Sequence, residues 1–243
     1  MEHVIVVGAT SAVAQAFIRI EAARGHRLTL IGRDAGRLAP IAADARIRGA
    51  AHVSAHALAL ASPHAIATLL AELPAPPTRA LVAHGSLTDS ARAERDLAHL
   101  AEELTVNMTS ACLWAQGLAG AMAQAGGGVL AVISSVAGDR GRYSNHAYGA
   151  AKAGLSQFCS GLRARMRDRG VHVLTVKPGF IDTPMTAHVK RKGPLWASAE
   201  RIAGGIDQAM TRRRNVAYLP AFWWPIMIAI RLLPEPLFKR LKF

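Results

Sequence analysis

The sequence contains few cysteines, few aromatic residues and few acids. Its two cysteines, Cys112 and Cys159, form no CxxC motif and no cluster with the ten histidines, which argues against a disulfide framework and against a metal site. The opening residues, MEHVIVVGATS, enter an apolar segment directly, without the basic start and small-residue cleavage site of a secretory signal. We therefore expect a reduced, cytoplasmic location and no bound metal.

The scarcity of acidic residues leaves the chain strongly basic. Lys and Arg number 29 against 16 Asp and Glu, a formal net charge of +13. Such an excess favours an anionic partner, and nucleic acid, a phospholipid surface or a phosphorylated ligand all meet that description. No motif interleaves basic and aromatic residues as RNA-binding motifs do, so we expect no nucleic-acid partner. Hydrophobic residues make up 51% of the 243 positions, which predicts one folded domain.

Apolar segments of strand length alternate with helical stretches along most of the chain. The seven expected strands are HVIVVG, RLTLIG, AHVSAHA, RALVAHG, GVLAVISS, VHVLTVKPG and NVAYLP. The helices expected between them include residues 12–24, 34–48, 62–73, 93–124, 147–169 and 198–212. This alternation predicts an α/β fold of the Rossmann type, doubly wound, with a mostly parallel seven-stranded sheet and helices on both faces. We expect this single domain over residues 1–219 and an apolar, basic extension over 220–243.

The first expected strand runs into GATSAVA, a turn that leads into a helix. Gly8, Ala12 and Ala14 stand where a nucleotide-binding turn of the G-x-x-x-G-x-G kind has three glycines. Such a turn directs backbone N–H groups, at the positive end of a helix, toward a pyrophosphate. The candidate cofactor-binding residues of the turn are Gly8, Thr10, Ser11 and Val13. A plain tight turn into an Ala-rich helix is the alternative.

The second expected strand ends in LIGRD, where a residue that recognises the adenosine ribose would stand. An acid there would bind a free 2′-hydroxyl, but the sequence has Gly32 followed by Arg33. A guanidinium suits a 2′-phosphate, so we expect NADPH (NADP+) as cofactor, with NADH disfavoured. Two alternatives are that Arg33 is a solvated loop cation and that Asp34 binds the ribose.

The segment ISSVAGDRGRYSNHAYGAAK carries the strongest chemical signal. Tyr148 and Lys152 are four residues apart, so on a helix they share one face, where an ammonium would lower the pKa of the phenol. Chance gives only about 0.07 such YxxxK pairs in a chain of this composition. Ser135 follows a buried strand at the carboxyl edge of the sheet, where its hydroxyl would hold a substrate carbonyl beside the phenol. Ser134 is the neighbouring alternative, and strand alternation favours Ser135.

With these motifs the sequence resembles the short-chain dehydrogenase/reductase family over nearly all of residues 3–219. The order of the turn, Ser135, YxxxK and KPGFIDTPM carries the resemblance. It implies an NAD(P)-dependent enzyme acting on CH–OH and C=O groups. In that role Tyr148 donates a proton to the carbonyl oxygen, Ser135 polarises that oxygen, and Lys152 lowers the Tyr148 pKa while binding the nicotinamide ribose. Asn107, in LTVNMTSACL, matches the residue that positions a water for proton relay.

The resemblance also implies further cofactor contacts, at Leu60, Ala83, Gly85, Pro178, Gly179, Ile181 and Thr183, together with Tyr148 and Lys152. The sequence departs from the family in two places. The family's Asn-Asn-Ala-Gly segment is here VAHG (82–85), which keeps only Gly85 in register, and the usual acid near the adenine is replaced by Ala59. We interpret His84 as a packing or sheet-edge residue rather than as a catalyst, because Tyr148 already supplies the proton.

Within the family, GATS, VAHG, KPGFIDTPMT and the apolar extension are most similar to reductases of polyprenyl-phosphoryl 2-keto pentoses, which implies a lipid-linked keto sugar as substrate. The family's substrate lid is here PMTAHVKRKGPLWAS. Its Lys190, Arg191 and Lys192 would receive a phosphate or be solvated, and Trp196 would cap a ring or pack. A soluble ketone, alcohol or 3-oxoacyl thioester remains the alternative substrate. A non-catalytic dinucleotide sensor or nucleic-acid binder is disfavoured by the intact catalytic set.

The C-terminal extension has an apolar stretch of about 14 residues, fewer than the ~20 that a membrane-spanning helix needs. We expect Pro220 and Pro225 to interrupt any helix there. From Pro236 onward an amphipathic helix is expected, with Leu237, Phe238 and Leu241 on one side and Lys239, Arg240 and Lys242 on the other. We expect it to bind an anionic membrane surface peripherally, on the inner face of the cell membrane. Closing the substrate pocket or a subunit interface is the alternative.

Two long Ala-rich helices, expected over 93–124 and 147–169, resemble those that pair between subunits in this family. The resemblance therefore implies a homodimer or a homotetramer. Packing of both helices on their own sheet alone is the alternative.

Overall fold

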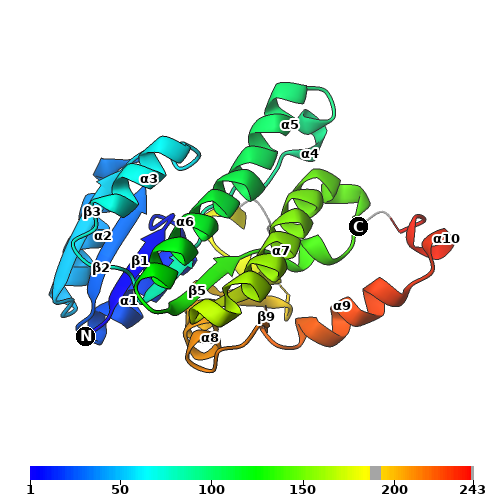
Figure 1. Ribbon diagram of the computed structural model, residues 1–243. Helices are drawn as coiled ribbons and strands as arrows, with labels where there is room; N and C mark the ends of the chain where they lie inside the picture. The colour runs from blue at the N-terminus through cyan, green and yellow to red at the C-terminus, as the bar shows by residue number, and fades with distance from the viewer. Residues whose placement is uncertain (187–192, 242–243) are drawn as a thin grey trace.

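The computed structural model describes residues 1–186 and 193–241. Its centre is a sheet of seven parallel strands in the order β3-β2-β1-β4-β5-β6-β9 (Figure 1). The strands are β1 (His3–Val7), β2 (Arg27–Gly32), β3 (His52–Ala57), β4 (Arg79–Val82), β5 (Gly128–Ile133), β6 (Val171–Pro178) and β9 (Val216–Leu219). The predicted seven-stranded, doubly wound Rossmann-type fold is confirmed.

Helices cover both faces of the sheet. On one face lie α1 (Ala12–Ala23), α2 (Ala35–Ile47) and α8 (Ala199–Thr211), and on the other lie α3 (Pro63–Ala71), α6 (Ser110–Gln124) and α7 (His146–Met166). Because successive residues of a strand point to opposite faces, Val4 and Val6 of β1 join the first core, whereas Ile5 and Val7 join the second. Both faces are therefore buried, as continuous apolar strands predict.

The single helix predicted over 93–124 is interrupted. Its place is taken by α4 (Ser90–Ala93), α5 (Leu97–Leu104), a π-helical turn (Thr105–Thr109) and α6. The Asp96 carboxylate caps α5 by accepting from His99 N at 3.0 Å, so the chain starts a new helix there. The prediction was wrong because apolar spacing continues across both the cap and the π turn.

Several short elements were not predicted. They are the 3₁₀ turns Val136–Asp139, Tyr143–Asn145, Arg167–Arg169 and Pro184–Thr186, and a separate pair of strands, β7 (Phe180–Asp182) and β8 (Trp196–Ser198). Strand β7 precedes the segment expected as the substrate lid, and β8 forms the last three residues of that segment. Lys190, Arg191 and Lys192 of that segment lie outside the described residues.

The C-terminal extension forms α9 (Trp223–Leu232) and α10 (Glu235–Phe238), which reach out beyond the β9 edge of the sheet (Figure 1). Pro225 does not interrupt α9, because it stands in the first helical turn, where its missing N–H has no intrahelical partner to lose. The expectation for Pro225 was therefore wrong. No helix in residues 1–186 or 193–241 is long and apolar enough to cross a bilayer.

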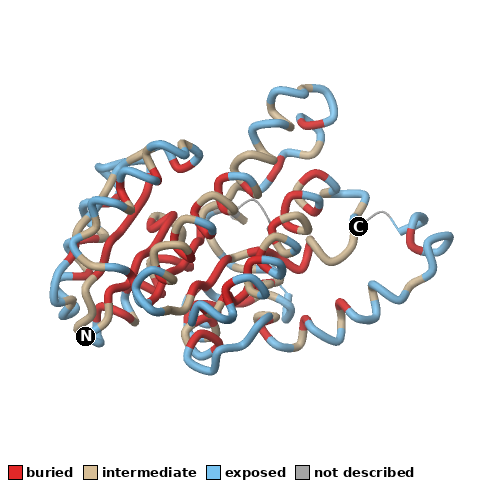
Figure 2. Tube along the Cα trace, viewed as in Figure 1, coloured by how far each residue is buried: buried red, intermediate tan, exposed pale blue. Residues whose placement is uncertain are grey.

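The amphipathic helix expected from Pro236 is also wrong. Helix α10 has four residues and ends at Phe238, whose ring is buried under the Arg140 guanidinium, 3.8 Å from its centroid. Leu237 is instead 51% exposed, so these two side chains do not share one face. Lys242 lies outside the described residues. Figure 2 shows buried positions recurring along α9 among exposed ones, because Trp223 and Met227 pack against Val136 of the domain.

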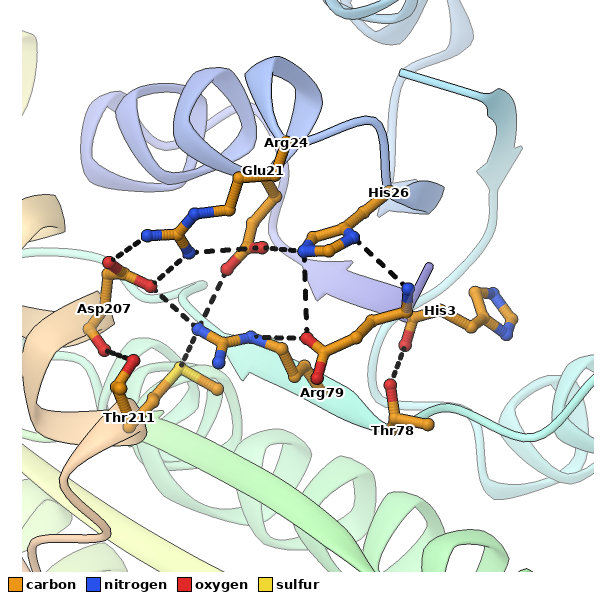
Figure 3. Close-up of polar contacts among 10 residues, drawn as sticks. His3, Glu21, Arg24, His26, Thr78, Arg79, Asp207 and Thr211 are labelled. Carbon is orange, nitrogen blue, oxygen red and sulfur yellow. Dashed lines mark hydrogen bonds and ion pairs between the residues drawn. The ribbon is translucent and has the colours of Figure 1, made fainter. Parts of the chain in front are cut away.

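A network of charged side chains joins α1, β4 and α8 at the amino ends of the strands (Figure 3). Arg79, the first residue of β4, contacts Glu21 of α1 at 3.0 Å and Asp207 of α8 at 2.9 Å. Arg24 binds the same Asp207 through two bonds of 2.6 and 2.7 Å. Glu21 has no exposed surface and His26 lies 3.5 Å from it. Burial raises the pKa of Glu21, and the guanidinium of Arg79 opposes this shift.

Candidate active site

The turn after β1 has the geometry of a phosphate-binding turn. Gly8 adopts a φ of +78°, and a Cβ built there would lie 2.6 Å from the backbone nitrogen of His84, so only glycine fits. Ser11 precedes α1 and its side chain makes no capping bond, which leaves the first-turn N–H groups of the helix to other acceptors. Val13 contributes at most its backbone here, because its side chain is buried in the core. The alanines in place of glycines keep the N–H donors.

A cleft of about 760 Å³ opens from this turn along the carboxyl edge of the sheet. Among the predicted residues it is lined by Gly8, Thr10, Ser11, Arg33, Leu60, Ala83, Gly85 and Thr183. Residues that follow five different strands thus come together, as expected at the point where the strand order reverses. A cleft of this volume suits a dinucleotide.

The end of β2 presents a cation to the cleft. A Cβ at Gly32 would meet Leu38 at 3.2 Å, whereas Arg33 is exposed and lines the cavity. The Asp34 carboxylate accepts from Arg37 N at 3.1 Å and caps α2, so it already has a structural role. Arg37 also lines the cleft and was not predicted as a cofactor-binding residue. Its place in the first turn of the helix that Asp34 caps, close to Arg33, was the sequence signal that could have revealed it. Two guanidinium groups therefore border this end of the cleft.

The two serines after β5 point in different directions. Ser134 is buried against α7, where its Oγ donates to Lys152 O at 2.9 Å and lies 2.8 Å from Ser156 Oγ. Ser135 instead lies beside the Tyr148 side chain, whose pKa its hydroxyl lowers, and its Oγ accepts from Ala137 N at 3.1 Å. Of the two serines, Ser135 is therefore the one placed beside Tyr148.

Tyr148 and Lys152 lie one turn apart on α7. The Lys152 ammonium is buried, 5.7 Å from the centroid of the Tyr148 ring, and donates to Ile133 O at 3.2 Å. Burial lowers the pKa of Lys152 to about 8. Burial also raises the pKa of Tyr148, while the neighbouring Ser135 hydroxyl and the Arg142 charge lower it. Lys152 is not one of these two opposing groups, and the expectation that Lys152 lowers the Tyr148 pKa stays a prediction.

Asn107 lies in the π-helical turn and is fully buried. Its Oδ1 accepts from Ser86 N at 3.0 Å, and a Cβ at Gly85 would lie 2.9 Å from this oxygen and 3.5 Å from Lys152 Nζ. Because Gly85 has no side chain, the Asn107 amide and the Lys152 ammonium can both lie close to its backbone. The helix bulge turns Asn107 toward the loop after β4.

Glu103, four residues before Asn107, holds this loop and was not predicted. Its Oε2 accepts from Ser86 Oγ and Thr88 Oγ1, each at 2.8 Å, and from Asn107 Nδ2 at 3.2 Å. The i, i+4 spacing of Glu103 and Asn107 on an expected helix was the signal that could have revealed it.

The end of β6 leads into an aromatic wall formed by Phe180, Trp196 and Trp223. Phe180 stacks on Trp196 with centroids 5.2 Å apart and meets Trp223 edge-on at 5.3 Å. Gly179 leaves room only for the Trp223 indole, and Trp223 packs on Val136, the residue after Ser135. Pro178 is buried, while Ile181 O and Thr183 N are both bonded to Thr186 Oγ1. The sequence did not connect Trp223 with Ser135.

A family model described as short chain dehydrogenase matches residues 2–193. The chain belongs to the short-chain dehydrogenase/reductase family. It is 37% identical over 243 residues to an uncharacterized oxidoreductase of Mycobacterium tuberculosis, covering 98% of this chain and 96% of that protein.

Solved structures show the same fold. The short-chain dehydrogenase of Sphingobium yanoikuyae in complex with NADPH matches with a TM-score of 0.83 and 22% identity, over 97% of each chain. A short-chain dehydrogenase of Burkholderia cenocepacia in complex with NADP matches with a TM-score of 0.84 and 18% identity, over 100% of this chain and 98% of that one.

As a short-chain dehydrogenase, the protein is an NAD(P)-dependent oxidoreductase with a nicotinamide dinucleotide as cofactor. The cleft fits that group: a glycine with positive φ opens the phosphate turn, cations border one end, and Gly85 keeps the other end free of side chain. Arg33 and Arg37 would hold the adenosine end, and Lys152 would face the nicotinamide ribose. The paired hydroxyls of Ser135 and Tyr148 can donate a proton to, or accept one from, an oxygen placed between them.

Proposed function

We propose that the protein is an NADPH-dependent reductase that converts a ketone to an alcohol. The observation that carries this proposal is the Ser135–Tyr148 hydroxyl pair beside the buried Lys152. When bound, the cofactor supplies the hydride. Tyr148 donates the proton to the carbonyl oxygen, and burial supports this role because it keeps the phenol protonated at neutral pH. Ser135 holds the same oxygen, and Asn107 orders the proton path toward Lys152.

The preference for NADPH rests on Arg33 and Arg37. Two guanidinium groups favour a 2′-phosphate, and Asp34, the acid that would bind a free ribose hydroxyl, is engaged in capping α2. We expect Arg33→Ala to weaken NADPH at least about tenfold while leaving NADH within a few fold. The exposed Arg95, outside the cleft, supplies the matched control as Arg95→Ala. Equal kcat/KM for NADPH and NADH in the unchanged protein would contradict the preference.

The substrate we propose is a lipid-linked keto sugar that carries a phosphate. Two features support it. Arg142 is half-buried beside Tyr148, and its Nε has no hydrogen-bond partner among the described residues, so a cation stands ready next to the catalytic phenol. In addition, Trp224, Ile228 and Leu232 form an exposed apolar stripe on the outer face of α9. The exposed cations Lys239 and Arg240 follow this stripe and would favour an anionic lipid surface.

Vesicle flotation tests the membrane part of the proposal. The outer stripe is replaced in the triple variant Trp224→Ser, Ile228→Ser and Leu232→Ser, rather than by truncation, because the inner face of α9 carries Trp223 of the aromatic wall. Leu97→Ser, at another exposed leucine, is the matched control. We expect the unchanged protein and the control to float with anionic vesicles in low salt, and the triple variant to remain at the bottom. If the unchanged protein does not float, the proposal that it binds a membrane surface is contradicted.

NADPH oxidation against a panel of keto-sugar lipids, soluble ketones and 3-oxoacyl thioesters tests the substrate. Turnover only with the lipid-linked ketones supports the proposal, and Arg142→Met should then raise their KM most. Turnover of the soluble compounds with equal kcat/KM would assign the protein to the alternative class.

We further propose a homodimer or homotetramer that pairs through α6 and α7. Light scattering at micromolar concentration with NADPH present tests this, and a monomer would contradict it.

A further inference from the structure

His84 lies on the floor of the cofactor cleft, between the phosphate turn and Gly85. Its backbone nitrogen is the atom that a side chain at Gly8 would strike, and its own side chain lines the cavity. This position departs from the family's Asn-Asn-Ala-Gly segment, so the resemblance assigns His84 no role. The structure gives it a defined set of contacts.

The hydrogen bonds around His84 determine which ring nitrogen carries the proton. Ser110 Oγ lies 2.7 Å from Leu60 O, and because a carbonyl only accepts, the single Ser110 proton is directed there. Ser110 Oγ also lies 2.8 Å from His84 Nε2, so it must accept a proton from that nitrogen. Trp114 Nε1 donates to the same Leu60 O at 3.0 Å and holds the arrangement in place. Nε2 therefore carries the proton.

The other ring nitrogen, Nδ1, is buried and has no hydrogen-bond partner among the residues the structure describes. Burial and the nearby charges of Lys152 and Arg33 lower the pKa of His84 to about 3, so the ring is neutral at physiological pH. Nδ1 consequently offers a lone pair and no proton. A buried acceptor of this kind calls for a donor from a ligand.

We propose that His84 Nδ1 accepts a hydrogen bond from a ribose hydroxyl of the bound dinucleotide. The phosphate oxygens of the cofactor are themselves acceptors and would repel a neutral Nδ1, which leaves the ribose hydroxyls as the donors nearest to the turn. The position of His84 between Gly8 and Gly85 lies along the path from the phosphate turn to Lys152. This inference rests on the proposed binding of NADPH in the cleft, and it does not depend on the substrate.

Two amide substitutions separate the two ring nitrogens. In His84→Asn the side-chain oxygen stands where Nδ1 was, so the acceptor is kept and the Ser110 contact is lost. In His84→Gln the amide nitrogen stands where Nε2 was, so the Ser110 contact is kept and the acceptor at Nδ1 is lost. The two variants are therefore matched controls for each other, and thermal unfolding without cofactor reports whether each is folded.

Calorimetric titration with NADPH, without substrate, is the measurement. We expect His84→Gln to weaken NADPH on the order of tenfold and His84→Asn to remain within about threefold of the unchanged protein. Unchanged affinity in folded His84→Gln, or equal losses in both variants, would overturn the inference. Failure of the unchanged protein to bind NADPH would instead contradict the proposed function, so the two failures are distinguishable.

Discussion

The Tyr148 hydroxyl is the group on which the proposed chemistry depends most directly. Tyr148→Phe removes only this oxygen, and we expect kcat to fall by about 10²- to 10⁴-fold because the proton donor is lost. NADPH binding, measured by calorimetry, should persist. The matched control is Tyr143→Phe in the same segment, where the ring is 71% exposed. Near-normal turnover in folded Tyr148→Phe would refute the assignment.

Lys152 gives the cofactor affinity a pH dependence. Burial lowers its pKa to about 8 from 10.5, so the ammonium loses its charge as the pH rises through about 8. We expect the affinity for anionic NADPH to fall over this range, and to be weaker but flat in Lys152→Met. Titrations with NADPH between pH 6.5 and 9.5, with the exposed Lys239→Met as control, measure this affinity.

The lowered pKa of Lys152 also affects stability. Between about pH 8 and 10.5 the unfolded chain binds more protons than the folded one, so the free energy of unfolding rises with pH.

At the scale of elements, the π-helical turn and the loop after β4 form a unit held by Glu103. Glu103→Ala removes the acceptor of three hydrogen bonds and should lower kcat on the order of 10- to 10²-fold by releasing Asn107. Glu103→Gln keeps one acceptor oxygen and should restore part of the rate. Glu102→Ala, at the exposed neighbouring position, is the control. Equal kcat in Glu103→Ala and the unchanged protein would contradict this positioning role.

The central strands were predictable because their apolar segments are buried on both faces, and the order of Ser135, Tyr148 and Lys152 identified the family. What the sequence did not show depends on interactions between distant segments. The packing of Trp223 against Val136 joins residues nearly 90 positions apart, and no local pattern records it. The π-helical turn was not predicted because the helical spacing of apolar residues continues through it. Pro225 was misjudged because its effect depends on its place within the helix.

For the molecule as a whole, the charge network of Figure 3 ties α1, β4 and α8 together. Arg79→Met removes the guanidinium nearest to the buried Glu21 carboxylate. The carboxylate keeps Arg24, at 3.7 Å, and His26, at 3.5 Å, so we expect the free energy of unfolding to fall by up to about 3–5 kcal/mol. Adding Glu21→Gln should recover part of the loss, because the buried charge is then removed as well. Urea denaturation measures both.

The control for this prediction is Arg48→Met, at the exposed Arg48–Asp44 pair, which should change stability by less than about 1 kcal/mol. The affinity for NADPH should be unaffected in Arg79→Met, since the network lies at the other edge of the sheet from the cleft. A loss of stability no larger than that of Arg48→Met would show that the buried network contributes little.

Strand β4 carries Arg79 at its start, and His84 follows its end. The chain takes five residue steps from Arg79 to His84, which span about 16 Å when extended. Changes at positions this far apart, with no shared partner, usually add in free energy. For protein engineering this separation is an advantage: substitutions that reinforce the Arg79 edge can offset the instability of substitutions that remodel cofactor choice at Arg33 or Arg37. The enzyme can therefore be redesigned at one edge while its thermal tolerance is adjusted at the other.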